Sequence, residues 1–327
     1  MKQKIKSSID LFVSNTSEVN QVFTWQDSLS KKMSALLFTL KGLAVNTVAI
    51  KQSRDIMKQN TGLFSTFRGN LTLPIASLLA LQAQPERLFK EVQAAYSALK
   101  EAKFYTSDYL TVAAYLMATQ AQVQDFESIA KKAHDFYSQM KSRHMFITGS
   151  DDVIYSVMLT LTKIDVEEGS RELENIYQAL KGQFPANSVQ AISQILMISG
   201  TSSEALIKVT DLNETFINHK MRMDRSYTAP NLAVLALLGL PNELVVDDLV
   251  EAYNYLRQQK AFGLFSIDKQ TGLLFTTAIV ASVYAEELND GVLVASITTT
   301  ITNIIIAQQA AITAAIIAST AASSANN

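Results

Sequence analysis

The chain of 327 residues contains no cysteine, and this absence excludes several kinds of chemistry. Disulfide bonds, thiolate nucleophiles and thiolate metal ligands all require cysteine. The chain has only three histidines (His134, His144 and His219), and they form no His-Glu-x-x-His pattern. Neither a glycine-rich phosphate-binding loop nor the Gly-x-Ser-x-Gly turn of many hydrolases occurs. We therefore predict no cofactor, no metal site and no catalytic residue from the sequence.

An excess of charge of one sign is also absent. The chain has 28 basic and 30 acidic residues, which gives a net charge of −2. A dedicated nucleic-acid-binding protein needs a basic face, so no nucleic-acid partner is predicted. The nearest basic run, at residues 2–6, is typical of a solvated N-terminal turn. The N-terminus lacks an apolar stretch long enough for a signal peptide, and together with the missing cysteines this predicts a cytoplasmic protein.

A repeated pattern is the main positive feature of the sequence. Six times, an aromatic residue opens a short polar turn that leads into an apolar helix. The five steps between these openings span 198 residues, so the mean period is about 40 residues. Such a period is typical of units that stack on their neighbours, and we expect the six aromatic residues to occupy equivalent, mostly buried positions. They are Phe67, Phe104, Phe146, Phe184, Tyr227 and Phe265.

Each repeat reads as a pair of helices. The first helix is short and almost entirely apolar, which is typical of a buried helix; examples are residues 73–80, 112–117, 153–159 and 232–238. The second is longer and amphipathic; examples are residues 86–96, 126–140 and 249–256. The pattern predicts an all-α fold of α/α helical hairpins, forming a superhelix (α-solenoid) or, if the superhelix closes, an α/α toroid.

The predicted domain organisation has three parts. Residues 1–62 form a helical N-terminal cap, residues 63–290 form about six helix pairs, and residues 291–327 form a C-terminal helix with a frayed tail. This last segment contains no charged residue. A buried or docked helix is the favoured interpretation, and a membrane anchor or an oligomer contact are the alternatives.

The richest candidate site is Gly149-Ser-Asp-Asp152, close in sequence to His144. If the first helices line the inside of a superhelix, their N-termini share one rim with further polar residues, among them Asn187 and Asn231. Simple helix capping is the competing interpretation and is favoured for each residue. The predicted ligand-binding residues are Asp151, Asp152, His144, Arg68, Asn70 and Asp108, with Arg68 placed to meet an anion.

A second acidic motif is Asp247-Asp-Leu-Val-Glu251, which matches the box that holds magnesium in isoprenoid synthases. Such enzymes need a second acidic cluster facing the first, and the sequence offers none. Acidic residues in the first turns of a helix also interact favourably with the helix dipole, which is the interpretation we prefer.

Several stretches together resemble a known family, namely residues 23–29, 39–42, 60–74, 104–110 and 144–152. They are similar to a family of uncharacterised proteins of comparable length from low-GC Gram-positive bacteria, catalogued as a domain of unknown function. The resemblance covers nearly the whole chain. It implies a bacterial, cytoplasmic protein and assigns no catalytic residue.

The function predicted from the sequence is that of a non-enzymatic helical-repeat protein. Its concave surface would bind a protein, a peptide or a small molecule. The first alternative is an α/α-toroid enzyme acting on a glycan or isoprenoid. The second alternative is a membrane-tethered scaffold, with membrane contact only through residues 291–320.

Overall fold

The computed structural model describes the chain except for residues 64, 201–202, 224–226, 264, 289–294 and 326–327. The described residues form fifteen α-helices, two short 3-10 helices and no β-strand, which confirms the all-α prediction. Whether the helices form a superhelix or a toroid stays a prediction. Part of the predicted C-terminal segment, residues 291–294 and 326–327, lies outside the described residues.

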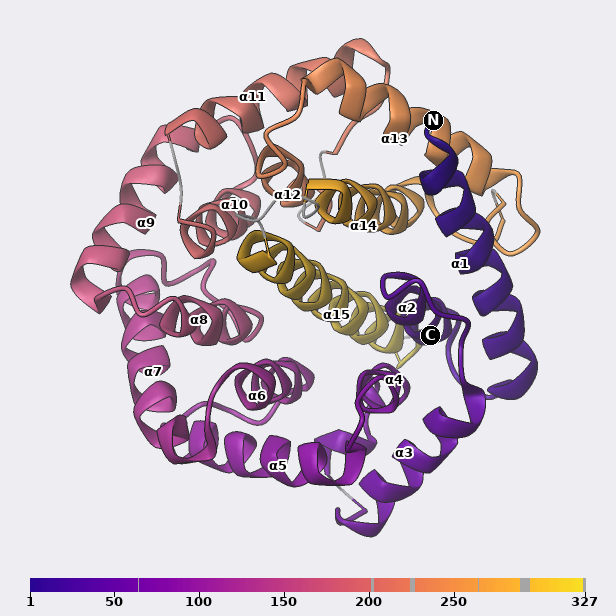
Figure 1. Ribbon diagram of the computed structural model, residues 1–327. Coiled ribbons are helices and arrows are strands. Elements are labelled where there is room, and N and C mark those ends of the chain that lie inside the picture. Colours follow the sequence, from indigo (N-terminus) through magenta and orange to yellow (C-terminus); the bar gives the residue numbers. More distant parts are fainter. Residues whose placement is uncertain (64, 201–202, 224–226, 264, 289–294, 326–327) are drawn as a thin grey trace. The chain divides into compact units, whose positions relative to one another are not determined.

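The helices alternate with short turns along the whole chain (Figure 1). In the first half they are α1 (Gln3–Val22), α2 (Ser28–Thr39), α3 (Thr47–Gln59), η1 (Thr66–Arg68), α4 (Thr72–Ala80), α5 (Pro85–Glu101), α6 (Asp108–Gln120), η2 (Val123–Asp125), α7 (Phe126–Arg143) and α8 (Asp152–Leu161). In the second half they are α9 (Val166–Leu180), α10 (Ala186–Ile198), α11 (Ser203–Asn218), α12 (Asn231–Ala236), α13 (Asn242–Arg257), α14 (Lys269–Leu288) and α15 (Ala295–Ala325).

The chain divides into two compact units. Unit 1 comprises Met1–Ser17, Thr39–Leu43 and Arg171–Ile305, and unit 2 comprises Glu18–Phe38, Ala44–Ser170 and Ile306–Asn327. In unit 2, α3, α5 and α7 pack side by side, and each also packs against the helix that follows it, α4, α6 or α8 (Figure 1). In unit 1, α11 packs on α12 and α13 on α14, while α10, α12 and α14 form a second row.

The two kinds of helix differ as their sequences predict. In α6, every residue from Leu110 to Ala118 is buried, and in α8 the same holds from Asp152 to Thr160. A helix surrounded by protein needs apolar side chains on all faces, which these helices have. In α5, by contrast, the buried residues follow one stripe: Leu88, Phe89, Val92, Ala95, Ala98 and Leu99.

The six aromatic openers do not share one buried position, so that expectation is wrong for part of the set. Phe67 and Phe104 are buried, whereas Phe146 is 96% exposed and Phe265 is fully exposed. In the last opening Phe262 fills the core instead, with its ring centroid 4.9 Å from that of Phe12. The aromatic residue closest to the capping position is therefore not always the one that packs.

A helix C-terminal motif accounts for the packing of Phe104 and of Met221. Lys103 and Lys220 have left-handed backbone angles, φ 73° and φ 55°. The residue that follows each lysine donates its N–H back to the helix, Phe104 to Leu99 O at 3.2 Å and Met221 to Phe216 O at 2.9 Å. This is the Schellman arrangement, in which an apolar residue after the left-handed position packs on the helix end. Phe104 and Met221 are both buried.

The C-terminal helix α15 contains one stretch among the described residues, Thr300–Ile317, that is long and apolar enough to cross a membrane. Of this stretch, 61% is buried in the structure. Core helices satisfy the same length and hydropathy test, so the role of this segment stays a prediction.

Candidate functional site

The N-terminus of α6 brings together two of the predicted site residues. Ser107 is the capping residue, because its side chain accepts the N–H of Leu110. Asp108 is therefore free of a capping role, and its carboxylate instead accepts a 3.2 Å hydrogen bond from the side-chain amide of Asn70. The Asp108 carboxylate also lies close to Gly69: a Cβ atom added to Gly69 would be 3.1 Å from Oδ1 of Asp108. Asn70 and Asp108 thus connect the turns that precede α4 and α6.

The environment of Asp108 disfavours its charge. Burial raises the pKa of the Asp108 carboxyl above its ordinary value, and the hydrogen bond from Asn70 opposes this shift only in part. A carboxyl removed from water without a compensating positive charge holds its proton more tightly.

Asp151 and Asp152, at the start of α8, have different roles. Asp152 is buried, and its Oδ2 accepts the Gly149 N–H at 2.7 Å, so this carboxylate holds the preceding turn in place. Asp151 makes no side-chain capping hydrogen bond, and its side chain reaches solvent. Surrounding protein nevertheless desolvates it and raises its pKa, while the backbone N–H groups of Asp151 and Asp152 oppose the shift. Asp152 is thus buried and bonded to the preceding turn, whereas Asp151 is exposed; a ligand-binding role for either residue stays a prediction.

Two tyrosines, Tyr109 on α6 and Tyr137 on α7, feel the charge of these carboxylates. Desolvation raises the pKa of Tyr109 to about 12, and the charges of Asp151 and Asp108 add to the shift. Desolvation also raises the pKa of Tyr137, with further contributions from Asp152, Asp151 and Tyr105. Both α6 and α7 pack against α8, which begins directly after Asp151. We call Tyr105, Asp108, Tyr109, Tyr137 and Asp151 the acidic–tyrosine surface.

Tyr105 and Asp151 expose this surface to solvent, while Asp108, Tyr109 and Tyr137 are half-buried. Tyr105 is 89% exposed, and Phe146, in the turn before α8, is 96% exposed. Within the part of the chain that the structure describes, no lysine, arginine or histidine forms an ion pair with Asp108 or Asp151. Exposed aromatic side chains beside unpaired carboxylates are typical of an interaction site rather than of an inert surface.

The other two predicted residues lie at helix C-termini. Arg68 donates hydrogen bonds to the Lys58 carbonyl, to the Thr61 carbonyl at 2.6 Å and to the Thr61 hydroxyl at 3.1 Å. Its guanidinium thus satisfies acceptors at the C-terminal end of α3, an interaction that the helix dipole favours. His144 ends α7, and its N–H donates to the Met140 carbonyl at 2.8 Å.

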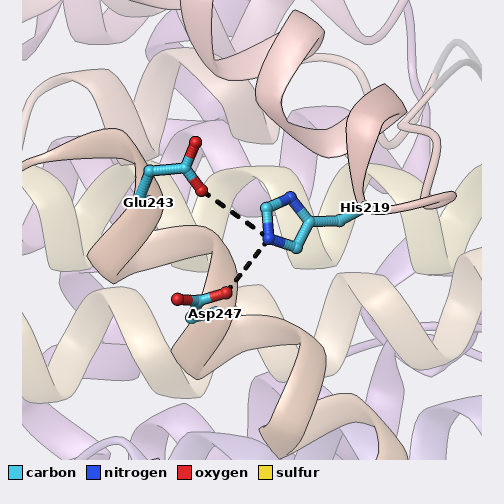
Figure 2. Close-up of side chains that lie close together, drawn as sticks. All are labelled: His219, Glu243 and Asp247. Atoms are coloured by element: carbon cyan, nitrogen blue, oxygen red, sulfur yellow. Dashed lines mark hydrogen bonds and ion pairs between the residues drawn. The ribbon is translucent and has the colours of Figure 1, made fainter.

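The acidic motif of α13 separates into two environments. Asp248 is buried and accepts the Tyr284 hydroxyl at 2.7 Å. Asp247 is exposed and lies beside His219 and Glu243, as Figure 2 shows. Among the described residues, these three form the one group of histidine and carboxylate side chains placed to hold a metal ion. Sequence reasoning missed this group because its members come from different helices, and it missed Tyr109 and Tyr137 for the same reason.

Comparison with known proteins places the chain in a family. Residues 15–311 match a family described as "Protein of unknown function (DUF4003)". The chain is also similar to the uncharacterized protein YeaA of Bacillus subtilis (strain 168), with 28% identity over 216 residues. That alignment covers 63% of this chain and 63% of the relative, so the chain spans less than two thirds of that protein's length. No solved structure matches. Since the family match extends over most of the chain, the protein belongs to the DUF4003 family, in agreement with the resemblance found in its sequence.

Proposed function

We propose that the protein is a non-enzymatic binding protein whose acidic–tyrosine surface holds a cationic peptide segment of a partner protein. The observation that supports this proposal is the environment of the Asp108 and Asp151 carboxyl groups. Both carboxyls are partly desolvated, both have raised pKa values, and neither has a cationic partner among the described residues.

The chemistry of the surface fits lysine and arginine side chains. A guanidinium binds a carboxylate through two parallel hydrogen bonds and also stacks on aromatic rings. The ring of Tyr105, which is 89% exposed, offers a cation–π contact to the same side chains. A bound cation would restore the charge balance that burial disturbs, and would lower both carboxyl pKa values.

The exposed aromatic residues favour a peptide over a small ion. Phe146 and Tyr105 are large side chains that remain almost entirely in water. Aromatic side chains of this kind are enriched among the residues that dominate binding energy at protein interfaces. A peptide that alternates cationic and apolar residues can contact the carboxylates and the exposed rings together.

Fluorescence anisotropy of labelled peptides tests the proposal. An arginine- and lysine-rich peptide should bind the wild-type protein, and a glutamate-rich peptide of equal length should not. Asp151→Asn and Asp108→Asn should each weaken binding at least about tenfold, or about 1.4 kcal/mol. Glu127→Gln, an exposed carboxylate in the first turn of α7, is the matched control and should bind like wild type. Equal affinity in wild type and both aspartate variants would overturn the proposal.

A second candidate function is that of an enzyme acting on a glycan. The raised pKa values of Asp108 and Asp151 favour it, because glycoside hydrolysis uses a carboxyl group that stays protonated as general acid. Incubation with oligosaccharides distinguishes the two functions. Product formation that is lost in Asp151→Asn supports the enzyme, whereas peptide binding without product formation supports the binding protein.

A further inference from the structure

We infer that His219, Glu243 and Asp247 form a binding site for one divalent transition-metal ion. The site belongs to unit 1 and is separate in sequence from the acidic–tyrosine surface. His219 directly follows α11, and the two carboxylates lie on α13, which packs against α11. Glu243 and Asp247 are four residues apart, so they lie one above the other on the same face of their helix.

The distances suit a single ion. The Nε2 atom of His219 lies 3.0 Å from Oδ1 of Asp247 and 3.6 Å from Oε2 of Glu243 (Figure 2). The three potential ligand atoms all lie within 4.8 Å of one another. Two ligands that bind one tetrahedral ion at about 2.1 Å lie about 3.4 Å apart. Small side-chain rotations bring the three atoms to this spacing, and the side-chain exposures of Asp247 (64%) and Glu243 (72%) leave room for them.

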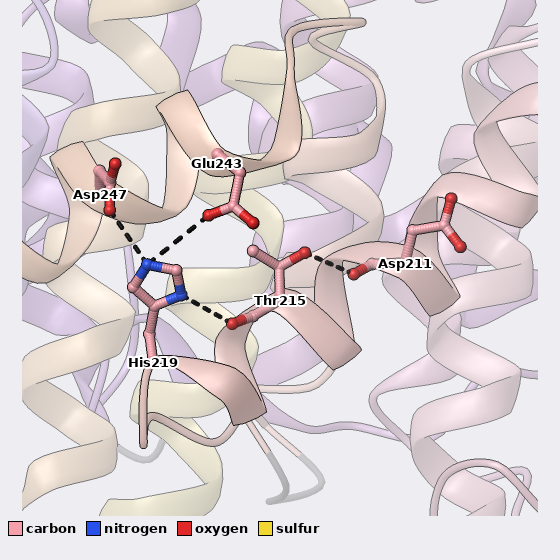
Figure 3. Close-up of polar contacts among 5 residues, drawn as sticks. All are labelled: Asp211, Thr215, His219, Glu243 and Asp247. Carbon is pink, nitrogen blue, oxygen red and sulfur yellow. Dashed lines mark hydrogen bonds and ion pairs between the residues drawn. The ribbon is translucent and has the colours of Figure 1, made fainter.

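The second ring nitrogen of His219 supplies independent support. Its Nδ1 lies 2.9 Å from the backbone carbonyl of Thr215 (Figure 3). A carbonyl oxygen only accepts, so Nδ1 carries a proton and donates it. In the neutral imidazole the lone pair is then on Nε2, the atom that faces both carboxylates. Histidines that bind metals usually donate their other N–H to a carbonyl or carboxylate in this way, which fixes both tautomer and ring orientation.

The supporting carbonyl is itself held in place. Thr215 is buried, and its hydroxyl donates a 2.8 Å hydrogen bond to the Asp211 carbonyl one turn earlier in α11 (Figure 3). The imidazole therefore lies at the hydrogen-bonded C-terminal end of α11, where the Thr215 carbonyl also accepts the backbone N–H of His219 at 3.1 Å. A lone pair facing two carboxylates is electrostatically unfavourable unless a cation lies between them. Either a metal ion or a proton on Nε2 provides that cation.

The ligand set selects the class of metal. One imidazole nitrogen and two carboxylate oxygens suit Zn²⁺, Co²⁺ or Mn²⁺, whereas Mg²⁺ and Ca²⁺ prefer oxygen ligands alone. Three protein ligands leave at least one position for water or for a ligand from solution. The site would therefore be an open one.

Metal titration of the intact protein tests the inference. Wild-type protein, purified without chelators, is titrated with Zn²⁺ by calorimetry and with Co²⁺ by visible absorption, with Mg²⁺ as the comparison ion. We expect one tight Zn²⁺ per chain, the absorption of low-symmetry Co²⁺, and no comparable Mg²⁺ binding. His219→Ala and Asp247→Asn should each lower the Zn²⁺ affinity at least about tenfold.

The controls separate a metal site from a simple ion pair. Glu214→Gln removes an exposed carboxylate of α11 outside the group and should bind Zn²⁺ like wild type. Circular dichroism of each variant confirms that its helices are intact. If wild type binds no stoichiometric Zn²⁺, the cation at His219 is a proton; if His219→Ala binds Zn²⁺ equally well, the ion lies elsewhere. Either result makes the inference wrong. Peptide binding at the acidic–tyrosine surface tests the proposed function independently of this result.

Discussion

The hydroxyl of Tyr284 donates a 2.7 Å hydrogen bond to the Asp248 carboxylate, and both side chains are buried. Tyr284 lies on α14 and Asp248 on α13, so this bond joins the two helices of one pair. The other carboxylate oxygen of Asp248 lies 3.1 Å from the N-terminal amino group. The carboxylate is thus satisfied from two directions, as a buried charge requires.

Removal of this hydroxyl should destabilise unit 1. Tyr284→Phe keeps the ring but leaves the buried Asp248 carboxylate with one donor fewer, which should cost about 1–3 kcal/mol of unfolding free energy. Urea denaturation measures the change. Tyr255→Phe is the matched control, because Tyr255 donates a 2.6 Å hydrogen bond to Asp10 at the exposed surface and should matter less. An equal loss in the two variants would contradict this assignment.

The buried and exposed aromatic openers should respond differently to truncation. Phe104→Ala removes a buried ring that packs edge-on against His134 and Tyr137, and should cost about 3–5 kcal/mol. Phe146→Ala removes a ring that is 96% exposed and should leave the melting temperature nearly unchanged. Thermal unfolding of both variants checks this, and a similar loss of stability in each would contradict the different burial of the two rings.

Glycine at a left-handed lysine should stabilise the protein. Lys103 has φ 73° at the end of α5, a conformation that side chains with a Cβ adopt at a cost. Lys103→Gly should therefore raise the unfolding free energy by roughly 0.5–1 kcal/mol, after the entropy of glycine in the unfolded chain is subtracted. Lys103→Ala is the control, because alanine keeps the Cβ and should give no gain. Chemical denaturation that ranks alanine above glycine would be inconsistent with the Schellman geometry.

The pH dependence of stability should carry the signature of Asp151. Its pKa in the folded protein is raised above the ordinary value of 3.8, so the folded state binds the proton more tightly than the unfolded state. Asp151 therefore contributes to the free energy of unfolding fully below pH 3.8. This contribution is lost as the pH rises through the pKa that Asp151 has in the folded protein. In Asp151→Asn, which cannot titrate at this position, this decrease in unfolding free energy with rising pH should be absent.

Asp165 provides a comparison of opposite sign. Hydrogen bonds from the backbone N–H groups of Glu168 and Glu167 lower the Asp165 pKa below 3.8. Asp165 therefore contributes to the free energy of unfolding above pH 3.8, and this contribution is lost as the pH falls through the pKa of Asp165 in the folded protein. Urea denaturation of wild type, Asp151→Asn and Asp165→Asn across the acidic range measures both trends. Parallel pH profiles for the two variants would contradict the different environments of these carboxyls.

The sequence predicted those parts of the structure that depend on neighbouring residues along the chain. The apolar run of α6 and the stripe on α5 follow helical spacing, so their burial can be read from a single segment. Which of Phe262 and Phe265 is buried cannot be read from one segment. It depends on the packing of the turn against Phe12, which lies far away in the sequence.

The candidate sites show the same division. Asn70, Asp108 and Asp151 could be placed before apolar helices because such turns are recognisable in sequence, while their role in binding stays a prediction. The different environments of Asp151 and Asp152 depend on which carboxylate accepts the Gly149 N–H, a detail that spacing does not encode. The meeting of His219 with Asp247, 28 residues further on, depends on the packing of α11 against α13.

Hydrogen exchange followed by mass spectrometry, with and without the cationic peptide, tests the proposed binding function most directly, because it locates the bound segment on the chain. We predict slower exchange in residues 104–110 and 144–153 of the wild-type protein, with no change in residues 242–257. The same peptide should give no protection in Asp151→Asn. Protection that is absent from both segments, or that is unchanged in Asp151→Asn, would contradict the assignment of the acidic–tyrosine surface as the binding site.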